Sequence, residues 1–389
     1  CVLPIKYTKK INCDFICFQI QFNIQLTLSI INKMEEETPS SDGEEAVAAS
    51  LTQFDQGKHV AFLEMMYNMI PHSYQSQEIN LLTLAYFVIS GLEILQSCHI
   101  INKRAVAKWV LSFQTLPADN TEFFAGEFFG FCGSRSSQYP TDTKVESFNH
   151  SHLASTYCAL VVLKSIGYNF SLINKEPILS SLRNLQQNDG SFLPIHIGAE
   201  TDLRFTYCAA AICSLLGDWN GMNRETAKDY IINCQSYDGG FGMSPGLESH
   251  GGGTYCAVAS LCLMGYIHDD AVSNPSSSSL INISLLLQWC LQRQACDGGF
   301  QGRHNKPSDT CYAFWVGSVL KMIGGFELVD QNALIGFLLT CQSKYGGFSK
   351  FPYEHPDLYH SYYGLSAFSL LHEPHLSPIF PQLGVALFS

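Results

Sequence analysis

The chain has 389 residues, and its 34 Asp and Glu residues against 22 Lys and Arg residues give a net charge of −12. Nucleic-acid-binding domains carry basic surfaces, so this balance argues against a nucleic-acid partner. Hydrophobic residues make up 46% of the chain and charged residues only 14%, which indicates a large core or a sizeable apolar interface. The 15 cysteines lie mostly in apolar runs without a CxxC pair, which is typical of reduced cysteines in a cytoplasmic protein.

Residues 1–57 are predicted to be a disordered or artefactual extension before a single domain at 58–389. The first methionine is Met34, and the acidic run MEEETPSSDGEE that it begins is typical of disorder. Residues 15–31 are apolar but contain three Gln and one Asn, which makes them a poor membrane span. We therefore expect no stable membrane insertion.

A Gly-rich turn recurs along the chain at intervals of roughly 50 residues. Its copies are LQQNDGSF (185–192), CQSYDGGF (234–241), RQACDGGF (293–300) and CQSKYGGF (341–348). Each copy follows a segment with helical periodicity, and its glycines end that helix because they accept a positive φ. A second element opens an apolar helix: STYCAL (155–160), FTYCAA (205–210), GTYCAV (253–258), DTCYAF (309–314) and HSYYGL (360–365). The repeat predicts an all-α fold of stacked helical hairpins.

Alignment of the second element brings three potential metal ligands into register. Cys311 occupies a column that holds a tyrosine in the other copies, namely Tyr157, Tyr207, Tyr255 and Tyr362. Asp309 and His360 both stand two positions before this column, in consecutive repeats. Because equivalent positions of adjacent repeats lie side by side, we expect Asp309, Cys311 and His360 to converge at one end of two neighbouring helices.

Asp, Cys and His are all zinc ligands, and three protein ligands with one open position are typical of a catalytic zinc site. A D-x-C pair alone is common by chance, and core packing explains a lone cysteine or histidine equally well. A nucleophilic Cys311 has less support, since no His stands beside it in a triad-like order. The register favours a site for one Zn²⁺ per chain.

Basic residues precede this potential metal site. Arg303 and Lys306 stand just upstream of it, and His250 lies in SHGGGTYC, where three glycines leave backbone N–H groups open to a ligand. With the hydroxyl of Tyr312, these residues could form a local cationic patch for a diphosphate or a carboxylate. Each charge taken alone is explained as well by a solvated loop. Aromatic residues near the same helix ends would line either a cavity or a core: Tyr207, Tyr255, Trp315 and Tyr363.

Three stretches, HGGGTYC, GGFQGRHNKPSDTCYAFW and PDLYHSYYGL, resemble the β-subunits of protein prenyltransferases, and the resemblance extends from about residue 58 to residue 385. It looks closest to the β-subunit of protein geranylgeranyltransferase type I in its plant form. It implies an (α/α)6 barrel of six inner and six outer helices, in an obligate heterodimer with an α-subunit. The implied substrates are geranylgeranyl diphosphate (GGPP) and proteins ending in Cys-a-a-X, with X mostly Leu, such as small GTPases.

The resemblance also implies roles for individual residues. Asp309, Cys311 and His360 match the zinc ligands, and the residues that match the diphosphate site are His250, Arg303, Lys306 and Tyr312. Arg204 matches an arginine near the carboxy-terminus of the substrate peptide, and Tyr255 and Trp315 match aromatic residues of the lipid channel. The substrate cysteine, held on zinc as a thiolate, would attack C1 of the isoprenoid while the basic cluster stabilises the departing diphosphate.

Three positions bear on the subtype. Thr83 matches a place where the farnesyl enzyme carries a channel-shortening Trp, and a Thr there leaves room for about one more isoprene unit. Tyr363 departs from the Phe typical of animal type I enzymes and resembles the Tyr of the farnesyl enzyme. Lys350 matches a magnesium-binding Asp of farnesyl enzymes, and its ammonium could replace the magnesium charge. We therefore expect Mg²⁺ not to be required.

Farnesyltransferase and Rab geranylgeranyltransferase β-subunits are alternatives, as is a non-catalytic helical-barrel scaffold. Thr83 and Lys350 argue against the farnesyl enzyme, a dependence on an escort protein would indicate the Rab enzyme, and the intact metal and cation positions disfavour the scaffold. A terpene cyclase would need a more acidic motif than Asp269-Asp270 provides. The stretch NPSSSS (274–279) is expected to be a loop insertion.

Overall fold

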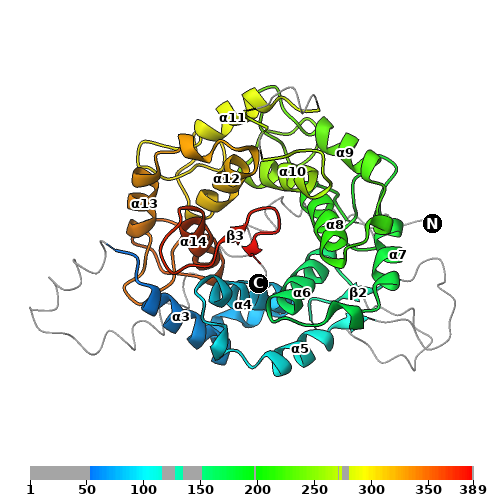
Figure 1. The fold of residues 1–389 in the computed structure, drawn as a ribbon, viewed down its shortest axis with the longest axis horizontal. Helices are drawn as coiled ribbons and strands as arrows, with labels where there is room; N and C mark the ends of the chain where they lie inside the picture. Colours follow the sequence, from blue (N-terminus) through cyan, green and yellow to red (C-terminus); the bar gives the residue numbers. More distant parts are fainter. Residues whose placement is uncertain are drawn as a thin grey trace, which may run out of the picture.

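Helices of the chain form two concentric rings, which Figure 1 shows end-on. The structure is a computed structural model and describes residues 53–115, 128–134, 151–196, 199–269, 271–273 and 280–387. In this part of the chain the inner ring consists of α4 (Leu81–Ile94), α6 (Leu153–Ser165), α8 (Leu203–Leu216), α10 (Gly251–Leu263), α12 (Thr310–Ile323) and α14 (Leu358–Leu370). The outer ring consists of α3 (Gln56–Asn68), α5 (Lys103–Leu111), α7 (Lys175–Leu185), α9 (Arg224–Asn233), α11 (Ile283–Leu291) and α13 (Gln331–Thr340).

The inner ring is closed, because each inner helix packs against the next and α14 packs back against α4. Inner helices are buried nearly all round, as the apolar sequences of the second repeat element require, and α12 and α14 are buried along most of their length. The expected (α/α)6 barrel is confirmed. No helix of the described part has both the length and the apolarity to span a membrane.

The Gly-rich turns connect neighbouring repeats. Gly239 has φ +95°, and a Cβ added to it would lie 2.3 Å from the backbone carbon of Leu285 in the following outer helix. The last turn makes the same contact around the ring, since a Cβ on Gly346 (φ +89°) would lie 2.1 Å from the carbonyl oxygen of Lys58 in α3. Glycine is therefore required by both conformation and close approach, and the final Gly-rich turn joins the last repeat to the first described helix.

The predicted start of the domain at residue 58 lies inside a helix. α3 begins at Gln56, and the carboxylate of Asp55 caps it by accepting a hydrogen bond from the N–H of Lys58 at 3.1 Å. Phe54 packs against the core as well. The predicted extension and the Ser-rich insertion lie, apart from residues 53–57, outside the described residues.

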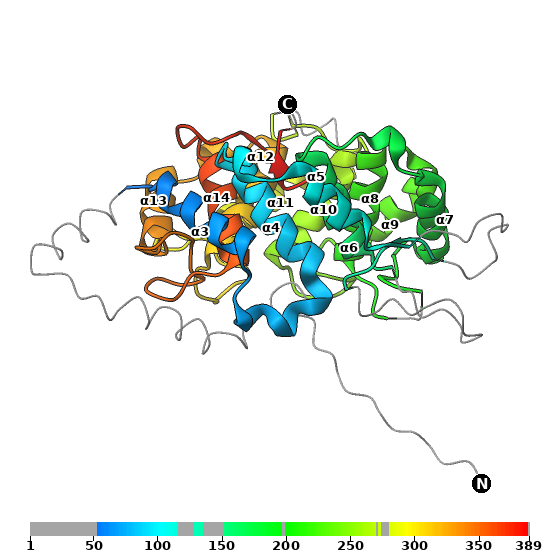
Figure 2. The same cartoon turned by 90° about the horizontal axis from the view of Figure 1, so that it is seen from below.

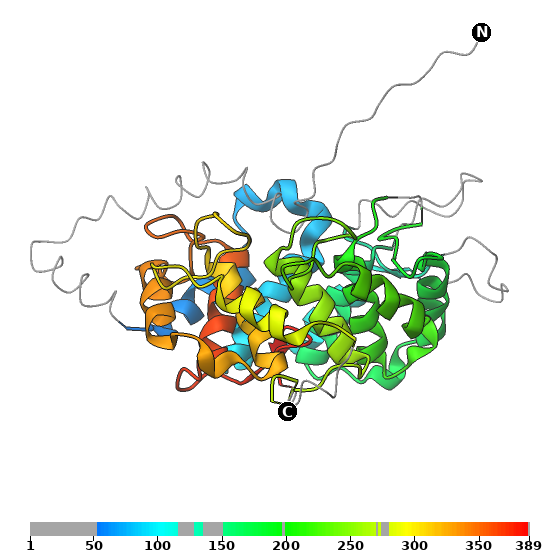
Figure 3. The same cartoon turned by 90° about the horizontal axis from the view of Figure 1, so that it is seen from above.

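The two ends of the barrel differ. The segment η1 (His72–Asn80) leads into α4 at one end, whereas the chain reaches its C-terminus at the other end (Figures 2 and 3). Two short antiparallel strands, β3 (Ile379–Phe380) and β4 (Val385–Ala386), place a hairpin in the middle of the inner ring (Figure 1). A second small pair joins β1 (Gln114–Thr115) to β2 (Gly130–Phe131). The η1 end is the one at which the inner helices begin.

Capping side chains mark that end of the barrel. The inner helices from α6 onward each begin after a residue whose side chain accepts a backbone N–H of the first turn: His152, Asp202, His250, Asp309 and Asp357. Such caps satisfy N–H groups that have no partner within the helix. The arrangement gathers carboxylates and imidazoles from successive repeats at one end of the barrel.

Candidate active site

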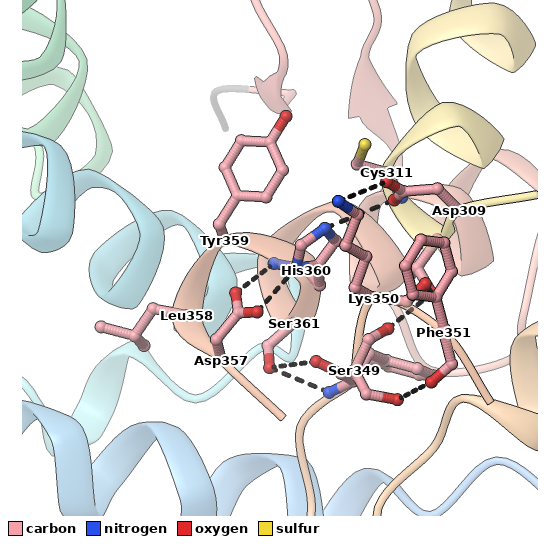
Figure 4. A network of polar contacts seen from close by, with 12 residues as sticks. Asp309, Cys311, Ser349, Lys350, Phe351, Asp357, Leu358, Tyr359, His360 and Ser361 are labelled. Atoms are coloured by element: carbon pink, nitrogen blue, oxygen red, sulfur yellow. Dashed lines mark hydrogen bonds and ion pairs between the residues drawn. The ribbon is translucent and has the colours of Figure 1, made fainter. Parts of the chain in front are cut away.

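The expected metal ligands come together at the start of α12 and α14. One ligand atom each of Asp309, Cys311 and His360 can be chosen so that all three lie within 4.8 Å of one another, and all three side chains are buried. Figure 4 shows them facing one another across the two helix ends. The cap positions Asp309, because its Oδ1 accepts the N–H of Cys311 at 3.0 Å. One carboxylate, one thiol and one imidazole form a donor set suited to Zn²⁺.

A second carboxylate orients the imidazole of His360. Asp357 Oδ2 lies 2.6 Å from His360 Nδ1, while the other oxygen, Oδ1, caps α14 by accepting the N–H of His360 at 2.8 Å. The opposite ring nitrogen, Nε2, lies 3.3 Å from Asp309 Oδ1. An imidazole that donates Nδ1–H to a carboxylate presents Nε2 to a metal, which is the usual outer-shell arrangement in zinc proteins.

The charges of this cluster are strongly coupled. Burial opposes a charge on His360, but the carboxylates of Asp357 and Asp309 raise its pKa to about 10. Burial also opposes the charge on Asp309, but His360 and the neighbouring Cys311 hold its pKa below the usual range. A metal on Nε2 would replace the proton there, so the two carboxylates can stabilise either a proton or a cation at this position.

Lys350 lies at the edge of the metal cluster. Its Nζ is 3.9 Å from Asp309 Oδ2, and its side chain is 29% exposed. The backbone holds the residue in place, because its carbonyl oxygen accepts the N–H of Thr310 at 3.1 Å. The ammonium group of Lys350 therefore lies next to the metal ligands (Figure 4), and its side chain is partly exposed.

His250, which is half-buried, and the buried Tyr312 form the inner part of the expected diphosphate site. His250 Nε2 lies 3.1 Å from the hydroxyl of Tyr312, and His250 Nδ1 accepts the N–H of Gly252 at 3.0 Å. Burial and the nearby Arg303 lower the pKa of His250 to about 4. The sequence predicted a cation here, but near neutral pH this imidazole is uncharged. Because Nδ1 accepts a hydrogen bond, Nε2 carries the ring proton, and His250 acts as a hydrogen-bond donor.

The remaining cations lie on the loop before α12. Arg303 is half-buried and pairs with Glu248 at 3.4 Å, a long and partly exposed ion pair. Lys306 is exposed, and its N–H donates to the carbonyl oxygen of Arg303 at 3.3 Å. An exposed pair of this kind contributes little stability, so Arg303 can exchange Glu248 for a ligand at small cost.

Arg204 lies at the start of α8, where Asp202 binds it. The guanidinium Nη2 lies 2.5 Å from Asp202 Oδ2 and Nε lies 3.0 Å from Oδ1, so the pair is bidentate and buried. Asp202 also caps α8. The carboxylate thus fixes the direction of the Arg204 side chain.

Aromatic side chains line the barrel beside the metal cluster. The ring of Trp315 lies 4.7 Å from that of Tyr255 and 4.3 Å from that of Tyr363, and its Nε1–H donates to the hydroxyl of Tyr359 at 3.2 Å. Thr83, on α4, accepts a weak hydrogen bond from the thiol of Cys158 at 3.7 Å. Thr83, Tyr255, Trp315 and Tyr363 therefore come from α4, α10, α12 and α14, around one side of the ring, and the expected Tyr207 lies on the neighbouring α8.

Asp357, Asp202 and Tyr359 contribute to the site although the sequence pattern indicated no function for them. The sequence does place both aspartates directly before an inner helix, where a carboxylate can cap the helix. Their second contacts, with His360 and Arg204, depend on side-chain geometry that the repeat pattern does not contain.

Comparison with known proteins places the chain in a family. The family model described as "Prenyltransferase alpha-alpha toroid domain" matches residues 54–385. The chain therefore belongs to the prenyltransferase α-α toroid family, which makes it a transferase of prenyl groups.

Particular relatives narrow this class. The chain is 64% identical to the geranylgeranyl transferase type-1 subunit beta of Arabidopsis thaliana, over 86% of this chain and 90% of the relative. It is 36% identical to the subunit of the same description from Dictyostelium discoideum, over 85% of this chain and 95% of the relative. Among solved structures it is similar to Candida albicans protein geranylgeranyltransferase-I complexed with GGPP, with a TM-score of 0.74, 26% identity, and coverage of 86% of this chain and 96% of that chain. Its place in the family is with the type-1 β-subunits.

Proposed function

We propose that the chain is the catalytic β-subunit of a zinc-dependent protein geranylgeranyltransferase type I. It transfers geranylgeranyl from GGPP to the cysteine of proteins that end in Cys-a-a-X, with X mostly Leu, such as small GTPases. The observation that carries the proposal is the cluster of Asp309, Cys311 and His360 within 4.8 Å, next to the ammonium of Lys350 and the aromatic wall.

The donor set fits zinc. Cys311 supplies a sulfur ligand, Asp309 an oxygen ligand, and the contact between His360 and Asp357 leaves Nε2 of His360 facing the other two. Bound zinc would supply a fourth coordination position and lower the pKa of a substrate thiol so that it reacts as a thiolate near neutral pH. The buried carboxylates of Asp309 and Asp357 would balance the metal charge.

Diphosphate binding is assigned to the residues between α10 and α12. His250 and Tyr312 donate hydrogen bonds from the buried side, while Arg303 and Lys306 supply charge from the loop. Lys350, beside the metal ligands, stabilises charge on the phosphate that departs as the carbon–sulfur bond forms. A fixed ammonium there performs the role of a magnesium ion, so Mg²⁺ is not required.

Arg204, held by Asp202, is assigned to the carboxy-terminal end of the substrate peptide. Tyr255, Trp315 and Tyr363 are assigned to the wall of the lipid site, and Thr83 to its length. The barrel domain at 58–389, completed by residues 53–57, forms an obligate heterodimer with a prenyltransferase α-subunit. The heterodimer works in the cytoplasm. It has no nucleic-acid partner and no stable membrane insertion.

The test is co-expression with an α-subunit, followed by metal analysis and competition assays. We expect one zinc per heterodimer. We also expect GGPP to be preferred over farnesyl diphosphate, and a Cys-a-a-Leu peptide to be preferred over a Cys-a-a-Ser peptide. Cys311→Ala should lose zinc and activity together, whereas Cys296→Ala, at an exposed cysteine, should keep both.

A farnesyl-transferring subunit is the second candidate, and Tyr363 is the residue that favours it. Preference for farnesyl diphosphate and the Ser peptide would establish that candidate and overturn the type I assignment. Full zinc content and activity in Cys311→Ala would overturn the metal site.

A further inference from the structure

A buried arginine stands in a column of the repeats that otherwise holds apolar residues. Arg293 is the first residue of the third Gly-rich turn, and the first residues of the other turns are Leu185, Cys234 and Cys341. Its backbone has the same role in all four turns, because each carbonyl oxygen accepts the N–H of the residue that directly follows the turn. All four side chains are buried, and Arg293 is 4% exposed. Burial of a guanidinium costs free energy that burial of leucine or cysteine does not, so the arginine calls for a functional reason.

The hydrogen bonds of this arginine are incomplete. Its Nε donates to the carbonyl oxygen of Trp289 at 3.3 Å, and the guanidinium carbon lies 5.0 Å from the centroid of the Trp289 ring. Its Nη1 is buried and has no hydrogen-bond partner among the described residues. An acceptor that moved to Nη1 of Arg293 would therefore gain a charge-assisted hydrogen bond away from water.

Negative charge reaches Arg293 from the segment that joins the second Gly-rich turn to α10. The ring of Trp289 packs against this segment, since a Cβ added to Gly240 would lie 2.7 Å from Trp289 Cε2. Burial lowers the pKa of Arg293, and the carboxylates of Asp238 and Glu248 oppose this effect. These two carboxylates are the candidates for a partner of Nη1.

Only one of the two carboxylates has the freedom to move. Asp238 Oδ1 accepts the hydroxyl of Ser249 at 2.5 Å and the N–H of Gly240 at 3.2 Å, which fixes the carboxylate within its turn. The side chain of Glu248 is 62% exposed and pairs with Arg303 at 3.4 Å. Because this pair is long and partly exposed, little free energy holds Glu248 to Arg303.

Glu248 thus interacts with two arginines that differ in mobility. Arg303 is half-buried on the loop before α12 and is assigned above to the diphosphate, whereas Arg293 is buried and fixed on Trp289. A diphosphate that bound Arg303 would leave the carboxylate of Glu248 beside an anion, and like charges at short range repel each other. Nη1 of Arg293 offers the displaced carboxylate a cation and an unused donor.

We propose that Arg293 is a positioning residue of the diphosphate site, which takes Glu248 from Arg303 when a diphosphate binds and so leaves the Arg303 guanidinium to the ligand. The ion pair of Glu248 with Arg303 breaks and one with Arg293 forms, so each of these charges has a partner in the complex. No proton moves, because a guanidinium stays protonated at neutral pH. This inference rests on the function proposed above and adds a residue that acts through Glu248.

The test is a double-mutant cycle on the heterodimer, with the Kd for GGPP measured by calorimetry. Arg293→Leu introduces the residue of the first turn, and it should raise the Kd roughly fivefold because Glu248 then stays on Arg303. Glu248→Gln removes both ion pairs, so its Kd should lie within about twofold of the wild type. In the Glu248→Gln background, Arg293→Leu should have no further effect, so the double variant should recover the affinity that Arg293→Leu loses.

A purely structural role of Arg293 predicts a different pattern. It would lower the free energy of unfolding of Arg293→Leu in urea and leave the Kd of the folded variant unchanged, and this result would overturn the inference. An equal loss of affinity in both backgrounds would overturn it too, since Arg293 would then attract the diphosphate without Glu248. Arg183→Leu is the control for the loss of one cation, because Arg183 pairs with Glu176 on α7, and it should leave the Kd unchanged.

The proposed function and the exchange fail in distinguishable ways. Wild-type heterodimer that binds neither GGPP nor inorganic diphosphate would overturn both, whereas normal binding by the wild type without the predicted cycle would overturn the exchange alone. If Arg293→Leu does not fold, crystal structures of the wild type with and without GGPP decide. Glu248 within hydrogen-bond distance of Arg293 Nη1 in the complex is the expected result, and any other position of Glu248 there would overturn the exchange.

Discussion

His59 Nδ1 accepts a hydrogen bond from the backbone N–H of Gly347 at 2.9 Å, although 288 positions separate the two residues in the chain. The imidazole belongs to α3, the first described helix, and the glycine belongs to the last Gly-rich turn. On its other side, His59 Nε2 lies 3.0 Å from Oε1 of Gln342. The ring lies between those of Phe54 and Phe348, at 4.9 and 4.6 Å. This residue joins the two ends of the outer ring.

Replacement of His59 by Ala should therefore open the barrel at its seam. The change leaves the N–H of Gly347 without its partner, removes one of the hydrogen bonds of the Gln342 amide, and creates a cavity between two aromatic rings. We expect the free energy of unfolding to fall by about 3 kcal/mol, measured by urea denaturation. His99→Ala, at an exposed histidine, should change it by less than about 0.5 kcal/mol. Equal effects of the two changes would show that the seam does not depend on His59.

Acid should weaken the same seam. Burial lowers the pKa of His59 to about 4, whereas an unfolded histidine titrates near 6.5. Between these values the unfolded chain takes up a proton that the folded chain does not, so stability falls as the pH drops from 6.5 toward 4. At pH 5 the loss from His59 should be about 2 kcal/mol relative to pH 7.

The measurement is the difference in this pH dependence between the wild type and His59→Gln, which cannot titrate at that position. His152 and His250 also have pKa values lowered to about 4, mainly by burial, and they contribute equally to both proteins. Identical pH profiles of the wild type and His59→Gln would contradict the assignment of this acid sensitivity to His59.

The convergence of Asp309, Cys311 and His360 was predictable from sequence because repeats of equal length bring equivalent positions together. Cys311 was identifiable because it breaks a column of tyrosines. The seam was not predictable, since no repeat precedes α3 and the contact of His59 spans nearly the whole described chain. The bonds of the tyrosine column were hidden for a similar reason: two of its hydroxyls donate to carbonyl oxygens of the turn between β3 and β4, which lies outside the repeat pattern.

The lowered pKa of His250 was hidden from the sequence for a different reason. The spacing of His250, Arg303 and Lys306 indicated three cations, but protonation depends on burial and on neighbouring charge. The partial burial of His250 could not be read from its polar, Gly-rich surroundings in the sequence. The opposite result at His360, whose pKa is raised to about 10, arises from two carboxylates that approach it only in the folded chain.

Asp357→Asn should weaken metal binding without unfolding the protein. An asparagine side chain can still cap α14, but it removes the negative charge that polarises His360. We expect the zinc affinity to fall by about 10- to 100-fold, measured by competition with a chelator. Asp330→Asn is the control, because Asp330 caps α13 and is exposed. If Asp357→Asn bound zinc as tightly as Asp330→Asn and kept the same stability, Asp357 would have no role in positioning His360.

Lys350 should make the enzyme independent of magnesium. Its Nζ lies 3.9 Å from Asp309 Oδ2, where a cation can reach a diphosphate next to the metal site. Lys350→Ala should lower kcat by on the order of 100-fold, since it removes a fixed charge from the departing group. Lys350→Asp should restore part of this activity only with millimolar Mg²⁺, because a carboxylate at this position can hold the ion that replaces the ammonium. Lys344→Ala, at an exposed lysine of the preceding turn, should leave kcat unchanged. The comparison is of initial rates with and without Mg²⁺ for all four proteins, and a strong stimulation of the wild type by Mg²⁺ would show that Lys350 does not substitute for the ion.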